Sequence, residues 1–158
     1  MTEARLIVEG EVERPGALAA LDLAAIDARR QIADVSQIDP ARSGVAVWLR
    51  GLLEHVGAKP TAAYLTLHAS ADDFHASIPL ASVLERGFII YALDGQPLPA
   101  SAGGPFRFFI RDYLACHSAE IDECANVKFV DRIELTASRG HDNRPHDDAA
   151  HAALHGSG

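Results

Sequence analysis

Cysteine and long apolar runs are both scarce in this 158-residue sequence. Its two cysteines, Cys116 and Cys124, are too few for a disulfide framework. Its apolar stretches, such as 88–93, are far shorter than the roughly 20 residues that cross a membrane as a helix. The N-terminal stretch MTEARLIVEGEVERPG carries charges where a secretory signal would need an apolar centre. We therefore expect no membrane association and a cytoplasmic location.

Basic residues are scarce as well. The chain has 14 lysines and arginines against 22 aspartates and glutamates, which gives a formal charge of −8. A nucleic-acid-binding protein would need a basic face, so the charge balance argues against a nucleic-acid partner. Hydrophobic residues at 48% and charged residues at 23% are ordinary for a folded protein. The length is enough for one domain with its own core.

Several catalytic signatures are missing from the sequence. It contains no Walker phosphate-binding loop, no Gly-x-Gly-x-x-Gly after a strand, no nucleophile elbow and no His-Glu-x-x-His. Ser/His/Asp triads are assembled in space and have no fixed spacing, so they are not excluded.

The hydrophobic periodicity predicts the secondary structure. Apolar residues at helical spacing before Gly57 predict a helix over 45–57. Pro79 favours a short helix after it, and Asp94-Gly95 predicts a tight turn. Alternating or β-rich patterns predict strands at 5–12, 63–68, 74–78, 88–93, 106–110 and 127–136, and a short strand with a helical turn at 17–26.

The order of these elements predicts the fold class. Strands come singly or in hairpins between short helices, and the long helical crossovers of a purely parallel sheet are missing. We predict an α+β fold with a mixed β-sheet core and a few short helices, in one domain over 1–136. Residues 137–158 lack apolar periodicity and are expected to form a flexible His/Asp-rich tail. That tail contains His141, His146, His151 and His155, which could collect metal ions but are more commonly just solvated.

A series of motifs in one block, 68–106, carries a family resemblance. The block contains Ser-Ala-Asp at 70–72, Ser-Ile-Pro-Leu at 77–80 and Asp-Gly-Gln-Pro-Leu-Pro at 94–99, and Gly-Gly-Pro-Phe-Arg follows at 103–107. The helix pattern at 45–57 and the segment Asn-Val-Lys-Phe-Val-Asp-Arg-Ile-Glu at 126–134 complete the set. In this order the motifs resemble the molybdopterin-binding domain of the sulfite oxidase family, over roughly residues 5–136.

The resemblance implies an oxidoreductase-type domain that binds the anionic cofactor molybdopterin. A phosphate is best held by a guanidinium, an ammonium and backbone N–H groups. By position in the motifs, the resemblance implies cofactor-binding roles for Gly103, Gly104, Arg107, Asn126 and Lys128. It also implies that electrons would pass to a separate electron-transfer protein, since this chain has no room for a haem domain.

The sequence departs from the family pattern at two positions. In the family, one cysteine thiolate before the helix pattern binds molybdenum, and a soft ligand suits such a centre. Here that stretch contains Ser36 and Ser43 but no cysteine. Ala102 stands where the family loop tends to have histidine. Molybdopterin is therefore implied as a cofactor, the molybdenum ligand is missing, and no catalytic residue is assigned.

Two other functions remain open. One is a cofactor-free binding or partner-docking module on the same fold. The other is a non-molybdenum metal site built from His68, His75, Cys116 and Cys124, because the two histidines flank a predicted hairpin turn. The spacing of the two cysteines is poor for a zinc finger, and cysteines are often simply buried.

Overall fold

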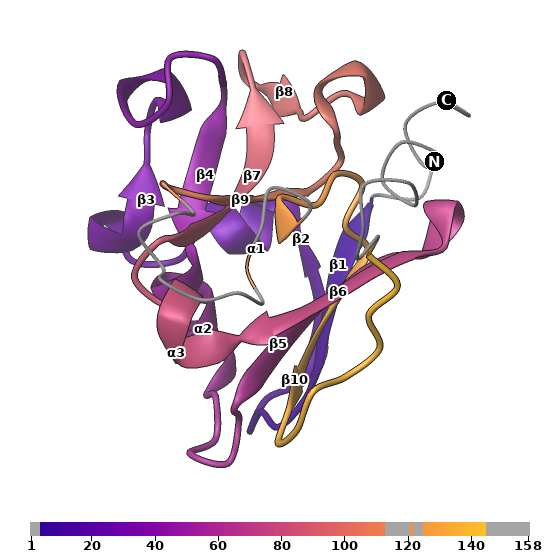
Figure 1. Cartoon of the computed structure of the whole chain (residues 1–158). Coiled ribbons are helices and arrows are strands. Elements are labelled where there is room, and N and C mark those ends of the chain that lie inside the picture. Colours follow the sequence, from indigo (N-terminus) through magenta and orange to yellow (C-terminus); the bar gives the residue numbers. More distant parts are fainter. Residues whose placement is uncertain (1–3, 113–120, 122–124, 145–158) are drawn as a thin grey trace.

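The computed structural model describes residues 4–112, 121 and 125–144, which form two β-sheets joined by short helices (Figure 1). The strands are β1 (Arg5–Gly10), β2 (Gly16–Ala19), β3 (Gln31–Ile32), β4 (Val45–Trp48), β5 (Tyr64–Ala69), β6 (Phe74–Pro79), β7 (Gly87–Leu93), β8 (Gln96–Pro97), β9 (Arg107–Ile110) and β10 (Arg132–Thr136). The helices are α1 (Ala20–Ala24), α2 (Leu49–Val56) and α3 (Leu80–Val83), with 3₁₀ turns η1 (Ala28–Arg30), η2 (Val35–Gln37), η3 (Ser70–Asp72) and η4 (Ala100–Ala102).

The first sheet is mixed, with strand order β2-β1-β10-β5-β6. Strands β1 and β10 are parallel, and all other neighbours in this sheet are antiparallel. Leu6 and Val8 of β1 are fully buried while their neighbours are more exposed, as the period of two in a strand requires. The predicted α+β fold with a mixed sheet is confirmed.

The second sheet is built around β7. Strand β4 pairs with one side of β7; on the other side, β9 pairs with residues 87–90 and β8 with residues 92–93. The turn between β7 and β8 contains Asp94 at φ 52° and Gly95 at φ 76°. Two consecutive residues of positive φ suit the right-handed twist of a hairpin, and the turn predicted at this position is confirmed.

The main core lies where the inner faces of the two sheets meet. It takes Leu65 and Leu67 from the first sheet, Ile89 and Phe108 from the second, and the apolar face of α2. A smaller cluster lies on the outer face of the second sheet, where Phe88, Ile90 and Phe109 are covered by Ile32, Val35 and Leu98. This outer face holds the candidate site.

Two predicted boundaries are wrong. The helix expected over 45–57 begins only at Leu49, because 45–48 pair with β7 as strand β4 and Trp48 has the extended conformation of an N-cap. The strand expected over 127–136 begins at Arg132. The preceding residues instead bond to the start of β9, with Phe108 N–H donating to Val127 O and Val130 N–H donating to Phe106 O.

The expectation of a flexible tail from residue 137 does not hold for its first part. Residues 140–144 lie along β6, the last strand of the first sheet: His75 N–H donates to Asn143 Oδ1 at 2.8 Å, and Ser77 N–H to Asp142 Oδ2 at 2.9 Å. Residues 145–158, including His146, His151 and His155, lie outside the described part of the chain. Among the residues that are described, no helix is long and apolar enough to cross a membrane.

Candidate functional site

The loop between β8 and β9 brings the chain sharply back onto the second sheet. Gly103 follows η4 at φ 94°, and a side chain there would lie 3.0 Å from Cδ of Arg107 and 3.2 Å from Cγ of Lys128. A side chain at Gly104 would lie 1.8 Å from the carbonyl oxygen of Leu98. Glycine at 103 is favoured first by its positive φ and then by the aliphatic stems of Arg107 and Lys128 beside it, whereas Gly104 is required by the backbone packing of its own loop.

Arg107 is the first residue of β9 and points to the outer face of the second sheet. It is opposite Ile90 and alternates with the inward-facing Phe108. Its side chain is buried, with 8% of the residue exposed. Nη1 donates to Ala102 O at 3.3 Å, but Nε has no hydrogen-bond partner among the described residues. Burial, followed by the positive charge of Arg42, lowers the pKa of the Arg107 guanidinium.

Lys128 is held beside Gly103 by the segment 125–130. Asn126 accepts a hydrogen bond from Ile110 N–H through Oδ1 at 2.8 Å, which fixes the segment to the end of β9. Phe129, at φ 58°, donates its N–H to Gly103 O at 2.8 Å. Lys128 itself is exposed. The structure therefore brings Gly103, Arg107 and Lys128 together, and the Asn126 side chain bonds the segment that carries Lys128 to the end of β9.

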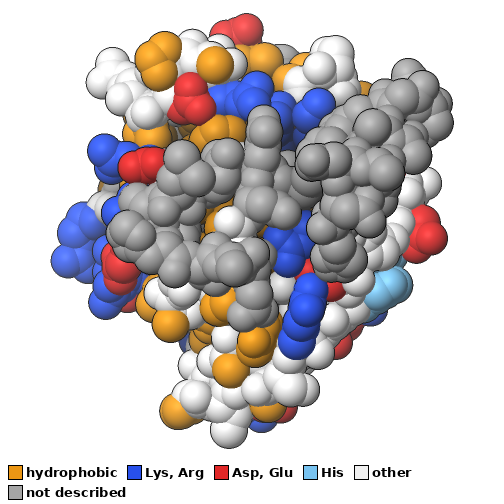
Figure 2. Space-filling view, viewed as in Figure 1, with side chains coloured by type: hydrophobic (Ala, Val, Ile, Leu, Met, Phe, Trp, Pro, Cys, Tyr) orange, Lys and Arg blue, Asp and Glu red, His pale blue; other side chains and the backbone are white. Residues whose placement is uncertain are grey.

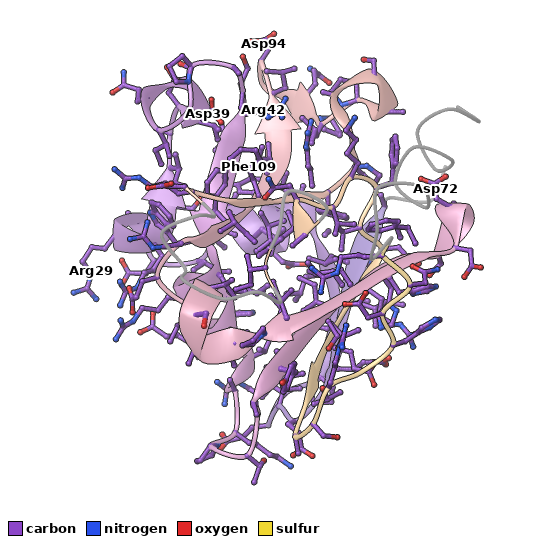
Figure 3. The ribbon with its side chains drawn as sticks, viewed as in Figure 1. Arg29, Asp39, Arg42, Asp72, Asp94 and Phe109 are labelled. Carbon is purple, nitrogen blue, oxygen red and sulfur yellow. The ribbon has the colours of Figure 1, made fainter. Side chains whose placement is uncertain are left out.

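Arg42 is a further candidate for the site that the sequence did not indicate. Its guanidinium carbon lies 5.3 Å from the centre of the Phe109 ring, a cation–π arrangement (Figure 3). Within the described residues, its buried Nε also has no hydrogen-bond partner. Arg42 comes from the irregular loop between η2 and β4, where no periodicity marks a residue that folds back over a sheet. Lys and Arg side chains gather over the β7–β8 end of the molecule in the space-filling view (Figure 2).

The arrangement suits a bound anion. Two guanidinium groups with unpartnered Nε atoms lie close enough for one to lower the pKa of the other, in a chain with a net charge of −8. Guanidinium groups bind phosphate or carboxylate through paired N–H donors. An anion at this position would use the free donors and offset the repulsion between the cations.

The positions where the family has a cysteine ligand and a loop histidine carry other groups here. Ser36 donates its hydroxyl to Asp34 Oδ1 at 2.6 Å, and Ser43 is exposed. Ala102 packs against the outer hydrophobic cluster and gives its carbonyl to Arg107. Neither serine supplies a thiolate, so the sulfur ligand of the family pattern is missing from this stretch.

His68 and His75 come together as predicted, but they bind each other. They are paired across β5 and β6, their Nδ1 atoms are 2.7 Å apart, and both are buried. Across residues 4–112, 121 and 125–144, no group of three or more His, Cys, Asp or Glu side chains is arranged to hold a metal ion. Cys116 and Cys124 lie outside the described residues, so their part in the predicted metal site is untested.

Comparison with known proteins identifies the family. The model of the oxidoreductase molybdopterin-binding domain matches residues 1–143, nearly the whole chain. The chain belongs to this family. No curated protein sequence matches it. Among solved structures, it is similar to the sulfane dehydrogenase SoxCD from Paracoccus pantotrophus, with a TM-score of 0.61 and 20% sequence identity.

The likeness to sulfane dehydrogenase concerns the fold. It covers 86% of this chain but only 39% of the SoxCD chain. The match shows the same arrangement of sheets in a larger oxidoreductase, and the family resemblance drawn from the motifs at 68–107 is confirmed. This chain is a molybdopterin-binding domain of oxidoreductase type by family.

Proposed function

We propose that this domain binds molybdopterin, and that Arg107 and Lys128, which lie against Gly103, hold the anionic phosphate of the cofactor. The backbone N–H groups of Gly103 and Gly104 already donate to Ala100 O and Pro99 O, so these two glycines shape the loop rather than supply donors. The observation that carries the proposal is the buried Nε of Arg107, which has no partner among the described residues. A buried N–H group without a hydrogen bond is costly, and burying an unpaired charge is more so. A phosphate oxygen bound here would satisfy the donor and neutralise the charge.

The neighbouring groups complete the proposed phosphate site. Arg42 adds a second guanidinium with an unpartnered Nε in the described structure, and Lys128 adds a flexible ammonium at the exposed side. Asn126 keeps the Lys128 segment attached to β9 through its bond to Ile110 N–H. These residues would bind and orient the cofactor. The bound cofactor would supply two-electron redox chemistry, and we propose that its electrons pass to a separate protein in the cytoplasm.

A second function has an observation in its favour. The stretch before α2 offers the hydroxyls of Ser36 and Ser43 where the family resemblance expects a thiolate, and Ser36 already bonds to Asp34. A hydroxyl is a harder ligand than a thiolate. The same fold could then serve as a cofactor-free docking module. The two functions differ in one measurable property, which is whether a pterin is retained.

The test is pterin and metal analysis of protein purified from a host that makes molybdopterin. We expect about one pterin per chain, measured by fluorescence after oxidation. The Arg107→Met variant should lose most of the pterin. The control is Arg29→Met, because Arg29 is exposed on the surface and pairs only with Asp27 among the described residues (Figure 3).

Wild-type protein that is folded but free of pterin would refute the proposal and leave the docking module. Pterin retained in Arg107→Met would show that the phosphate is held elsewhere. Pterin without molybdenum would support a cofactor-binding domain that lacks the family's metal ligand.

A further inference from the structure

A chain of polar contacts runs along the first sheet, with two buried imidazoles at its centre and the carboxylates of the exposed Asp73 and the partly buried Glu134 at its ends. His68 Nε2 lies 3.1 Å from Glu134 Oε1, His68 Nδ1 lies 2.7 Å from His75 Nδ1, and His75 Nε2 lies 2.9 Å from Asp73 Oδ1. The four groups come from β5, β6, β10 and the turn after η3. The two imidazoles are 2% and 8% exposed.

The number of protons in this chain of contacts is set by the chemistry of imidazole. Each of the three contacts joins two atoms that need one proton between them to attract each other. Two neutral imidazoles carry one N–H each, and a carboxylate carries none. One contact would then hold two lone pairs face to face. One extra proton, shared by the two rings, satisfies all three contacts.

We propose that His68 and His75 share this extra proton, and that it holds residues 140–144 on β6 in a pH-dependent manner. His75 then donates Nδ1–H to His68 and Nε2–H to Asp73, and His68 donates Nε2–H to Glu134. The 2.7 Å separation is a hydrogen-bond distance. Within the described part of the chain, these groups do not converge as a set of three or more metal donors, which favours a proton over a metal ion.

His75 is the link between this proton and the C-terminal segment. The ring of His141 stacks on the ring of His75 at 4.1 Å between centroids. The backbone of His75 bonds to Asn143 in both directions, with Asn143 N–H donating to His75 O and His75 N–H donating to Asn143 Oδ1. A reorientation of the His75 ring would therefore disturb both the stack and the backbone pair.

The charged groups around the pair set the direction of the pH response. Around His68, burial, Arg132 and His75 oppose a positive charge, and Glu134 favours it. Asp73 lies against His75 Nε2, His141 stacks on the His75 ring, and the Asp142–Arg144 ion pair lies farther along β6. Raising the pH removes the proton, leaves one contact unfilled and loosens the segment. Burial is the main cause that lowers the pKa of His68, so its neutral form is favoured in the fold. The stability that comes from burying His68 in its neutral form is present above pH 6.5, the ordinary pKa of histidine. It is lost as the pH falls below that value, because a proton added to His68 would bring its Nδ1–H face to face with the Nδ1–H of His75.

The direct test counts ring protons in wild-type protein by NMR with ¹⁵N-labelled histidine. We expect three ring N–H protons on the pair near neutral pH, and two after the pH is raised. The backbone amides of His75 and Asn143 should shift with the same midpoint. Two ring protons at neutral pH, or amides that do not follow the titration, would overturn the proposal. A change of the spectrum on adding a chelator would show that a metal ion takes the place of the proton.

A variant tests the link to the C-terminal segment. In His75→Gln, tryptic cleavage after Arg139 should be faster by roughly tenfold and should lose its pH dependence, because one charge-assisted hydrogen bond is removed. The control is His55→Gln in α2, an exposed histidine on another element. Equal cleavage rates in the two variants would refute the link.

Discussion

Replacing Gly103 with alanine would test whether the loop beside Arg107 and Lys128 is shaped by the proposed phosphate site. Gly103 has φ 94°, and the new methyl group would lie 3.0 Å from Arg107 Cδ and 3.2 Å from Lys128 Cγ. The left-handed backbone costs an alanine about 1–2 kcal/mol. Crowding in a packed site adds about 1 kcal/mol more. We expect a total loss of about 2–3 kcal/mol in the free energy of unfolding.

Gly95 offers a matched control in the turn between β7 and β8. Its φ is 76°, and a side chain there would meet nothing within 4 Å. Gly95→Ala therefore carries the backbone strain alone. At about 2–4 °C per kcal/mol for a chain of this size, Gly95→Ala should lower the Tm by roughly 2–8 °C and Gly103→Ala by roughly 4–12 °C.

The assay combines thermal unfolding, followed by the fluorescence of Trp48, with binding of inorganic phosphate measured by calorimetry. Gly103→Ala should also weaken phosphate binding by about tenfold or more, because the methyl group displaces the side chains that hold the anion. Gly95→Ala should bind phosphate like the wild type. Equal Tm values and equal phosphate affinities for the two variants would refute the reasoning.

Three further substitutions have definite expected outcomes. Arg107→Met should weaken phosphate binding by roughly ten- to a hundredfold yet leave the Tm unchanged or higher, since it removes a buried charge with an unpartnered Nε in the described structure; a lower Tm would contradict this. Burial raises the pKa of Asp142, but hydrogen bonds from Arg144 and Ser77 outweigh it and hold the pKa at about 2, below the ordinary 3.8. This group therefore contributes roughly 2 kcal/mol that is present above pH 3.8 and is lost as the pH falls toward 2, and acid unfolding curves of Asp142→Asn should lack that slope. Leu67→Ala in β5 should lower the free energy of unfolding by about 2–5 kcal/mol in urea titrations, because Leu67 is fully buried between the sheets; a loss below 1 kcal/mol would count against the assigned core.

The strands were predictable where local pattern and final structure agree. The run at 88–93 is β-rich and is followed at once by Asp94-Gly95. In the structure this run forms most of β7, the central strand of the second sheet. The stretch 45–48 misled because its residues also fit the helical spacing that follows. Its pairing with β7 is a contact distant in sequence, and it overrides the local pattern.

The cofactor-binding candidates were predictable only through the family motifs. Lys128 is distant in sequence from the Gly103–Arg107 motif, so spacing alone does not group them, yet the structure places the side chains of Arg107 and Lys128 against Gly103. Arg42 carries no motif, and its position over Phe109 depends on the fold of a whole loop. The contact of residues 140–144 with β6 was missed for a similar reason. In this contact the backbone N–H groups of β6 donate to side-chain oxygens of Asp142 and Asn143, so the segment carries no alternating strand pattern that the sequence could reveal.

The parallel pair of β1 and β10 has a consequence for how the protein is made. Residue 7 pairs with residue 132, and β10 lies between β1 and β5 as the middle strand of its sheet. During synthesis, β10, which joins β1 to β5, leaves the ribosome after the other four strands of this sheet. Contacts so distant in sequence form slowly, because a long loop must close first. The first sheet should therefore stay incomplete until β10 has been synthesised, which exposes the apolar faces of β1 and β5 to other chains in the meantime.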